Sequence, residues 1–132
     1  MLAGRFGDEA LQAVVGSPDR WLRLLRIAGT PVGYCGYELA ARFGREREAA
    51  MKLAQLYVHE SRRGEGLGRL MLDHVEARAR EHGREVLFLQ VNKRNAAAIG
   101  FYEAAGFSIA GAAVFDIGAG FVMDDYVMEK LL

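Results

Sequence analysis

The sequence predicts one α/β domain, 1–132, built on a mixed and mostly antiparallel sheet with a central pair of parallel strands. Three observations carry this prediction. Apolar runs at 51–58 and 86–91 flank an amphipathic helical pattern, and strands joined through a helix run parallel by a right-handed crossover. Turn signals between the other strand patterns favour antiparallel hairpins. The length of 132 residues suits a single domain.

The first half of the chain predicts a short helix followed by three strands. Helix-forming residues come first and are closed by Gly16-Ser17-Pro18. Apolar strand patterns follow, separated by a hairpin turn and by a charged connection. The predicted elements are a helix at 8–15, strands at 21–27 and 32–40, a connection at 42–48 and a strand at 51–58.

The second half predicts two helices and three strands. The first helix has one apolar face, formed by Leu67, Leu70, Met71 and Val75, and places Asp73, Glu76 and Arg80 elsewhere. Gly83 suits its end, and Gly106 suits the end of the second helix. The predicted elements are helices at 66–82 and 96–105, a buried strand at 86–91, and a closing hairpin of 107–115 and 121–130.

Composition excludes several classes of partner. The 17 basic and 17 acidic residues give a net charge of zero, so no global field attracts nucleic acid or an anionic membrane. No stretch approaches the roughly 18 apolar residues that span a bilayer. A single cysteine permits no internal disulfide, and the three histidines are scattered. We expect a cytoplasmic protein with no nucleic-acid partner, no membrane partner and no metal.

The glycine-rich turn after the strand at 51–58 predicts a pyrophosphate site. Glycines at alternate positions let backbone N–H groups approach a ligand, and the following helix adds its unpaired N–H groups and positive dipole end. The spacing fits neither a P-loop nor a dinucleotide fingerprint. The residues of this turn are Arg62, Arg63, Gly64, Glu65, Gly66, Leu67, Gly68 and Arg69.

Three motifs in order resemble one enzyme family. Arg63-x-x-Gly66-x-Gly68 matches the Arg/Gln-x-x-Gly-x-Gly/Ala signature with which GNAT-superfamily N-acetyltransferases hold acetyl-CoA. Residues 95–107 resemble the family's Asn-x-x-Ala-x-x-Phe-Tyr-x-x-x-Gly-Phe block, and 124–130 resemble its closing strand. On these motifs the chain is identified as a member of the family.

The resemblance implies the GNAT fold and direct acetyl transfer from acetyl-CoA to a primary amine of a small molecule or protein. In the family the strand before the turn separates from its parallel neighbour, and pantetheine pairs with its exposed backbone, an instance of strand addition. The turn residues would then take the pyrophosphate. The other expected cosubstrate contacts are the backbone of Leu56, Tyr57 and Val58 together with Asn95, which also suits a helix N-cap, and Tyr102.

Tyr102 is the expected general acid, since the family places the tyrosine of Phe-Tyr near the thioester sulfur. A phenol of pKa about 10 can protonate a thiolate whose acid has a pKa of about 8.5. The alternative is a half-buried tyrosine of the core. Cys35 is expected to be a small core residue, because the family forms no acyl-enzyme.

The amine side departs from the family pattern. Where many relatives place an acid on the strand before the turn, this chain has Lys52, and position 54 is alanine. An alkyl amine must still lose a proton before attack. We favour a water relay with Glu38 as the carboxylate; Asp116 and Asp125 are alternatives.

The family normally begins with one more strand and one more helix, and both are expected to be missing here. The strand at 21–27 would then be an unpaired edge, which predicts a homodimer through it or a swapped element. The alternative function is a non-catalytic acetyl-CoA-binding regulatory protein, favoured by Lys52 and the short N-terminal region. Transfer of a longer acyl group is a further alternative.

Overall fold

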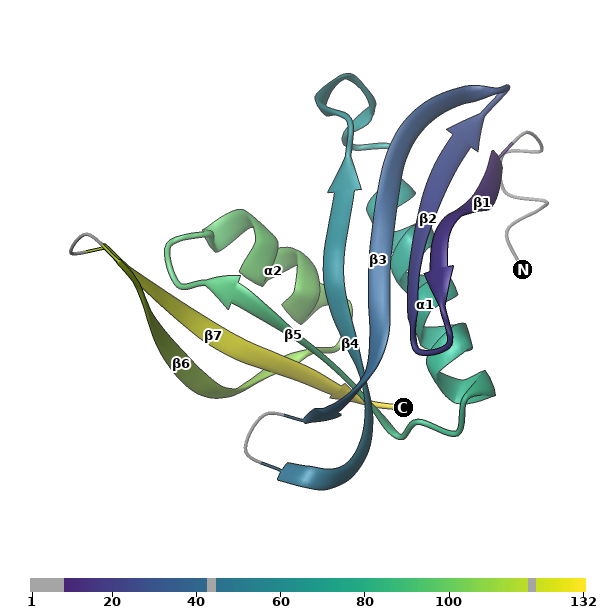
Figure 1. The fold of residues 1–132 in the computed structure, drawn as a ribbon. Helices are drawn as coiled ribbons and strands as arrows, with labels where there is room; N and C mark the ends of the chain where they lie inside the picture. The colour runs from purple at the N-terminus through teal and green to yellow at the C-terminus, as the bar shows by residue number, and fades with distance from the viewer. Residues whose placement is uncertain (1–8, 43–44, 119–120) are drawn as a thin grey trace.

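The computed structural model describes residues 9–42, 45–118 and 121–132, and within these ranges seven strands form one sheet (Figure 1). The strand order is β1-β2-β3-β4-β5-β7-β6. β4 and β5 run parallel, and every other neighbouring pair runs antiparallel. This arrangement confirms the predicted fold class.

The elements have the following bounds. The strands are β1 Glu9–Ser17, β2 Arg20–Ile27, β3 Thr30–Arg42, β4 Arg45–Val58, β5 Val86–Asn92, β6 Ser108–Gly118 and β7 Phe121–Leu131. A 3₁₀ turn, η1 Glu60–Arg62, follows β4, and the α-helices are α1 Leu67–Glu81 and α2 Ala96–Ala104. The predicted tip of the closing hairpin at 119–120 lies outside the described residues.

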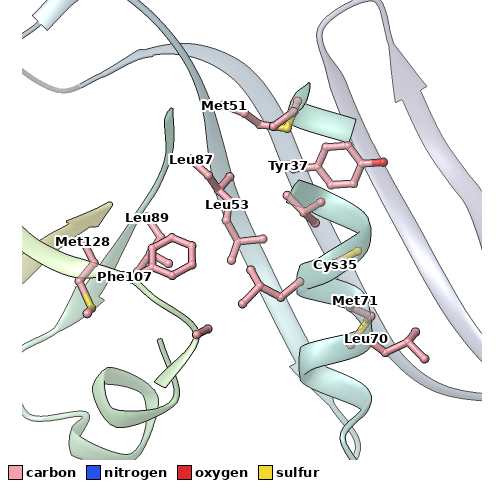
Figure 2. Close-up of a cluster of buried hydrophobic side chains, with 14 of the residues drawn as sticks. Cys35, Tyr37, Met51, Leu53, Leu70, Met71, Leu87, Leu89, Phe107 and Met128 are labelled. Carbon is pink, nitrogen blue, oxygen red and sulfur yellow. The ribbon is translucent and has the colours of Figure 1, made fainter. Parts of the chain in front are cut away.

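The apolar face of α1 anchors the core. Leu70 and Met71 are buried in one cluster with Cys35 of β3 and Leu53 of β4 (Figure 2). The same cluster continues through β5 and β7 to the side chains of α2, so both helices and the central strands share one core. Burial of each such aliphatic side chain contributes about 1.5–3 kcal/mol. The core therefore fixes where the first turn of α1 lies relative to β4.

The expected helix at 8–15 is wrong, because β1 occupies this segment. Its register pairs Leu11 with Leu25 of β2, and Leu11 packs against the core. Backbone pairing and apolar packing with β2 stabilise a strand here by more than the weak helix propensity of this segment stabilises a helix. Within the described ranges, no α-helix precedes Leu67.

The strand at 21–27 is therefore not an edge, since β2 lies between β1 and β3. The argument for a homodimer through an unpaired 21–27 strand is wrong for this reason, and within the described residues β1 is the edge strand on this side of the sheet. The expectation that the family's first strand is missing stays a prediction.

The charged segment 42–48, which was expected to be a connection, lies mostly within strands. β3 runs to Arg42 and β4 begins at Arg45, and these two residues are register partners. A strand needs only backbone pairing along its ladder, so a run of charged residues does not end it.

Among the described residues, no helix is both long and apolar enough to cross a bilayer.

Candidate functional site

β4 and β5 separate halfway along β4. Their parallel pairing covers only Ala50 with Val86, Met51 with Leu87 and Lys52 with Phe88. A bulge lies just beyond, where Gly36 of β3 pairs with Gln55 and the next residue, Tyr37, pairs with Leu53. The β5-facing backbone of β4 from Leu53 to Val58 is thus left out of the ladder. Such an edge offers N–H and C=O groups to an extended ligand.

The glycine turn continues from this free edge. Gly64 and Gly66 have φ of 84° and 78°, in the left-handed region that favours glycine. Gly66 is the N-cap of α1 and provides no capping side chain. The N–H groups of the first turn of α1 are therefore left for another acceptor, and the helix dipole favours an anion there.

The three arginines of the turn differ in their partners. Arg62 forms a two-pronged ion pair with Glu65, with its Nε 2.8 Å from Oε2 and its Nη2 2.9 Å from Oε1. The hydrogen bonds from Arg62 lower the pKa of Glu65. Arg69 Nε donates to Asp73 Oδ1 at 2.9 Å. Arg63 Nε instead donates to the carbonyl of Val58 at 3.3 Å, which leaves its charge available for an anion.

A cleft of about 660 Å³ brings the expected cosubstrate residues together. Its walls are the end of β4, the glycine turn with the start of α1, and α2. Glu65 is the one expected residue that does not line it, because its carboxylate faces Arg62. The expected residues that line the cleft are Leu56, Tyr57, Val58, Arg62, Arg63, Gly64, Gly66, Leu67, Gly68, Arg69, Asn95 and Tyr102.

α2 contributes two polar groups to this cleft. Asn95 caps the helix, since its Oδ1 accepts from the N–H of Ala98 at 3.1 Å, and this residue also lines the cleft. Tyr102 is half-buried and packs edge-on against Phe101 and Phe107, with ring centroids 5.1 and 5.6 Å away. Burial raises the pKa of the Tyr102 phenol to about 12, so the phenol keeps its proton at neutral pH.

Tyr102 also lines a second hollow, of about 260 Å³, that lies between the separated strands. Leu53 to Leu56 of β4 and Leu89 to Asn92 of β5 form its sides. Leu56, Asn95, Ala98 and Tyr102 line both the cleft and this gap. The cleft and the gap therefore adjoin along these four residues, and Tyr102 is one of them.

The structure does not bring Glu38 to Tyr102. Glu38 lines a third hollow, of about 320 Å³, where its Oε2 lies 3.2 Å from Nε of Arg20. This hollow shares Ala54 and Gln55 with the gap, so the two are neighbours. Of the other carboxylates considered, Asp125 is 3% exposed and its Oδ1 has no hydrogen-bond partner in the described part of the chain. The side chain of Asp116 lies outside the described residues.

Sequence reasoning missed Gln55. Only positions 52 and 54 were considered for a polar group on this strand. The bulge instead places Gln55 at the junction of the gap and the Glu38 hollow. A Cβ at Gly36 would lie 2.5 Å from Oε1 of Gln55, so a glycine opposite makes room for this carboxamide. A glycine inside a strand signals such a close approach, but its cross-strand partner is not visible from the sequence.

Comparison with known proteins identifies the family of the chain. Residues 6–107 match the model of the acetyltransferase (GNAT) family. The chain is 32% identical over 115 residues to an uncharacterised N-acetyltransferase of Mycobacterium bovis, covering 87% of this chain and 69% of that protein. The chain therefore belongs to the GNAT acetyltransferase family, and its enzyme class is acetyl-CoA-dependent N-acetyltransferase.

Two further proteins are similar over different shares of their length. An L-methionine sulfoximine/L-methionine sulfone acetyltransferase of Pseudomonas aeruginosa is 34% identical over 84 residues, 64% of this chain and 48% of that enzyme. The PaiA N-acetyltransferase of Thermoplasma acidophilum, solved in complex with coenzyme A, has a TM-score of 0.66 at 20% identity. That match covers 86% of this chain and 62% of the solved one, and it shows the common fold.

Proposed function

We propose that this chain transfers an acetyl group from acetyl-CoA directly to a primary amine of a small molecule or protein. The observation that carries the proposal is the continuous path from the glycine turn, along the free edge of β4, to Tyr102. An anion site, a strand edge and a neutral proton donor stand in the order in which acetyl-CoA presents pyrophosphate, pantetheine and thioester.

The cosubstrate would be held mostly by backbone. The pyrophosphate would accept hydrogen bonds from the turn and the start of α1, with Arg63 as the available positive charge. The pantetheine arm would pair with the backbone of Leu56, Tyr57 and Val58 and contact Asn95. Glu65 would act indirectly, by holding Arg62 at the mouth of the turn.

The transfer would need no covalent enzyme intermediate. The lone pair of a neutral amine attacks the thioester carbonyl, the carbon–sulfur bond breaks, and the amine loses a proton. Tyr102 would give its phenolic proton to the departing thiolate, and solvent would return that proton. Acid catalysis of this kind is typically worth 10²–10⁴-fold in rate.

The acceptor would enter through the gap and extend into the Glu38 hollow. Gln55 would orient the amine there with its carboxamide oxygen, and Glu38 would receive the amine's proton through water. Because one relative acts on L-methionine sulfoximine and L-methionine sulfone, amino acids of this type are the first acceptors to test. Peptide amino termini and polyamines complete the panel.

The rival is a non-catalytic acetyl-CoA-binding protein of the same fold. Lys52 in place of an acid favours it, as does the placement of Glu38 and Tyr102 in different hollows. Replacing Tyr102 with phenylalanine separates the two, with the acceptor panel as the assay. An enzyme loses turnover and keeps its affinity for acetyl-CoA, whereas a binding protein shows no turnover in either form.

Assembly and location are part of the same proposal. We propose a cytoplasmic protein, and a homodimer would form through β1, which is the N-terminal edge of the sheet. Sedimentation velocity tests the dimer, since a monomer at micromolar concentration would contradict it.

A further inference from the structure

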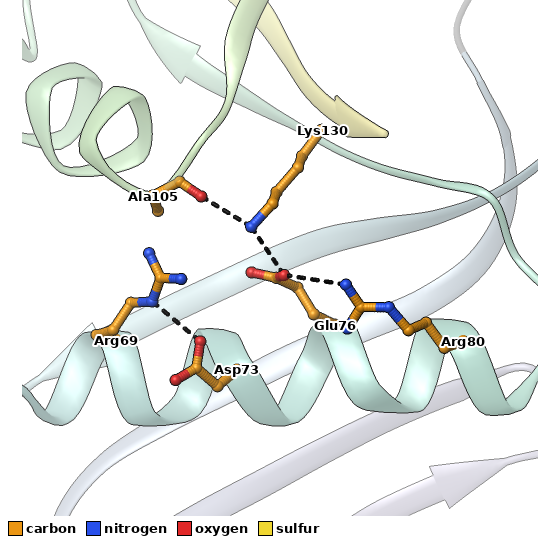
Figure 3. A network of polar contacts seen from close by, with 6 residues as sticks. All are labelled: Arg69, Asp73, Glu76, Arg80, Ala105 and Lys130. Carbon is orange, nitrogen blue, oxygen red and sulfur yellow. Dashed lines mark hydrogen bonds and ion pairs between the residues drawn. The ribbon is translucent and has the colours of Figure 1, made fainter. Parts of the chain in front are cut away.

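Lys130 joins three elements at one point. It lies on β7, in the closing motif that the proposed chemistry leaves unused. Its Nζ donates to Oε1 of Glu76 on α1 at 2.9 Å and to the carbonyl oxygen of Ala105 at the end of α2 at 2.9 Å (Figure 3). Arg80 approaches the same carboxylate oxygen at 3.8 Å. Lys130 therefore connects the two helices that form opposite walls of the cleft.

Glu76 is buried, contrary to the sequence prediction that placed it away from the core. It is 4% exposed, and its Oε2 has no hydrogen-bond partner within the described residues. A buried carboxylate is costly unless it is paired, and an apolar replacement is often as stable. Stability alone therefore does not explain this ion pair. The best-attested other role of a buried ion pair is to specify one relative arrangement of the elements that it joins.

The contact with Ala105 fixes the end of α2. The last carbonyls of a helix lack intrahelical donors, and a cation there also suits the helix dipole. The next residue, Gly106, has φ of +100°, and a Cβ on it would lie 3.2 Å from Cε of Lys130. The turn at Gly106 therefore brings the backbone close to the aliphatic part of the Lys130 side chain.

This end of α2 lies one turn from the proposed acid. The carbonyl of Tyr102 accepts from the N–H groups of Ala105 and Phe107, both at 3.0 Å. A shift of the Ala105 carbonyl is therefore transmitted to the backbone of Tyr102. The first turn of α1 forms the phosphate end of the cleft. The contacts from Glu76 through Lys130 to Ala105 therefore fix the position of α2 relative to α1.

We propose that Lys130 is a positioning residue, which holds α2 against α1 at the spacing that acetyl-CoA binding and Tyr102 require. The inference rests on the proposed function. It assigns Lys130 no contact with the cosubstrate, so its effect must appear through the geometry of α2.

The test compares K130M with two matched variants by calorimetric titration with acetyl-CoA and by turnover of the best acceptor. We expect K130M to weaken acetyl-CoA binding by about tenfold and to lower kcat. K130R restores both, because it returns a cation to the same carboxylate. K93M removes an exposed ion pair with Asp124, and it binds acetyl-CoA like wild type.

Amide hydrogen exchange gives a second readout, in which K130M, but not K93M, accelerates exchange at 99–105. If K130M does not fold, E76L takes its place, since it removes the carboxylate that accepts from Lys130. A folded K130M or E76L that matches wild type in affinity, kcat and exchange would overturn the inference. Wild-type protein that binds no acetyl-CoA would contradict the proposed function instead, so the two failures are distinguishable.

Discussion

Lys52 of β4 and Phe88 of β5 form the last register pair between the two parallel strands. Beyond this pair β4 keeps its ladder to β3 but none to β5, as far as Val58. The free edge, the gap beside Tyr102 and the approach to the glycine turn all follow from this separation. The site is therefore a property of the sheet, and the side chains complete it.

Replacing Tyr102 with phenylalanine should abolish acid catalysis without disturbing the cleft. The ring and its packing against Phe101 and Phe107 remain, and only the proton donor is lost. We expect kcat to fall by about 10²–10⁴-fold and the affinity for acetyl-CoA to stay unchanged. Steady-state kinetics with the acceptor panel and calorimetry measure the two quantities. Equal turnover in both proteins would exclude Tyr102 as the acid.

Replacing Gly64 with alanine should weaken acetyl-CoA binding, and Gly29 supplies a matched control. Both glycines have positive φ, 84° and 81°, and an added Cβ would meet no atom within 4 Å at either position. Each substitution should cost about 1 kcal/mol of stability through backbone strain. Only G64A should also weaken acetyl-CoA binding, because Gly29 lies in the β2–β3 turn and does not line the cleft. Equal affinities in calorimetry would mean that the turn does not bind the cosubstrate.

Acid should destabilise the protein through His74. Burial, with smaller contributions from Arg23 and Arg78, lowers the pKa of His74 to about 4, and its Nε2 lies 3.0 Å from the Tyr37 hydroxyl. The unfolded chain takes up this proton near pH 6.5, so it binds more protons than the native state between pH 6.5 and 4. The stabilisation is complete above about pH 6.5 and is lost as the pH falls toward 4.

Urea denaturation at pH 7.5 and 5.0 measures this effect. Because His74 is partly exposed, we expect a loss on the order of 1 kcal/mol, and H74Q should lose less. An equal loss in both proteins would assign the acid sensitivity to other groups.

Cys35 should be inert in the native protein. It is fully buried, and burial raises the pKa of its thiol to about 12. Because only the thiolate reacts, iodoacetamide at pH 8 should leave native protein unmodified and label urea-unfolded protein fully. Mass spectrometry gives the extent of labelling. Rapid stoichiometric labelling of native protein would contradict the buried position of β3 and reopen the question of an acyl-enzyme.

Local chemistry made the turn and its helix predictable. Glycine is required at Gly64 and Gly66 by the backbone angle at those positions, and the helix predicted at 66–82 is observed at Leu67–Glu81. The predicted strand edge at 51–58 is also present, although its separation from β5 came from the resemblance to the family.

Features that depend on distant partners were not predictable. β1 forms because its backbone pairs with β2, and the helix propensity of the segment itself contains no information about that partner. Glu76 is buried because Lys130, 54 residues away, pairs with it. Likewise, the sequence separates Glu38 and Gln55 widely, and only the register of β3 and β4 places them in one hollow.

Calorimetric titration with acetyl-CoA tests the central claim most directly, with dephospho-CoA and S-acetylpantetheine as controls. We predict micromolar binding at one site per chain, similar affinity for dephospho-CoA, which keeps the pyrophosphate, and binding at least about tenfold weaker for S-acetylpantetheine, which lacks it. Absence of binding, or equal affinity for acetyl-CoA and S-acetylpantetheine, would contradict a pyrophosphate site at the glycine turn.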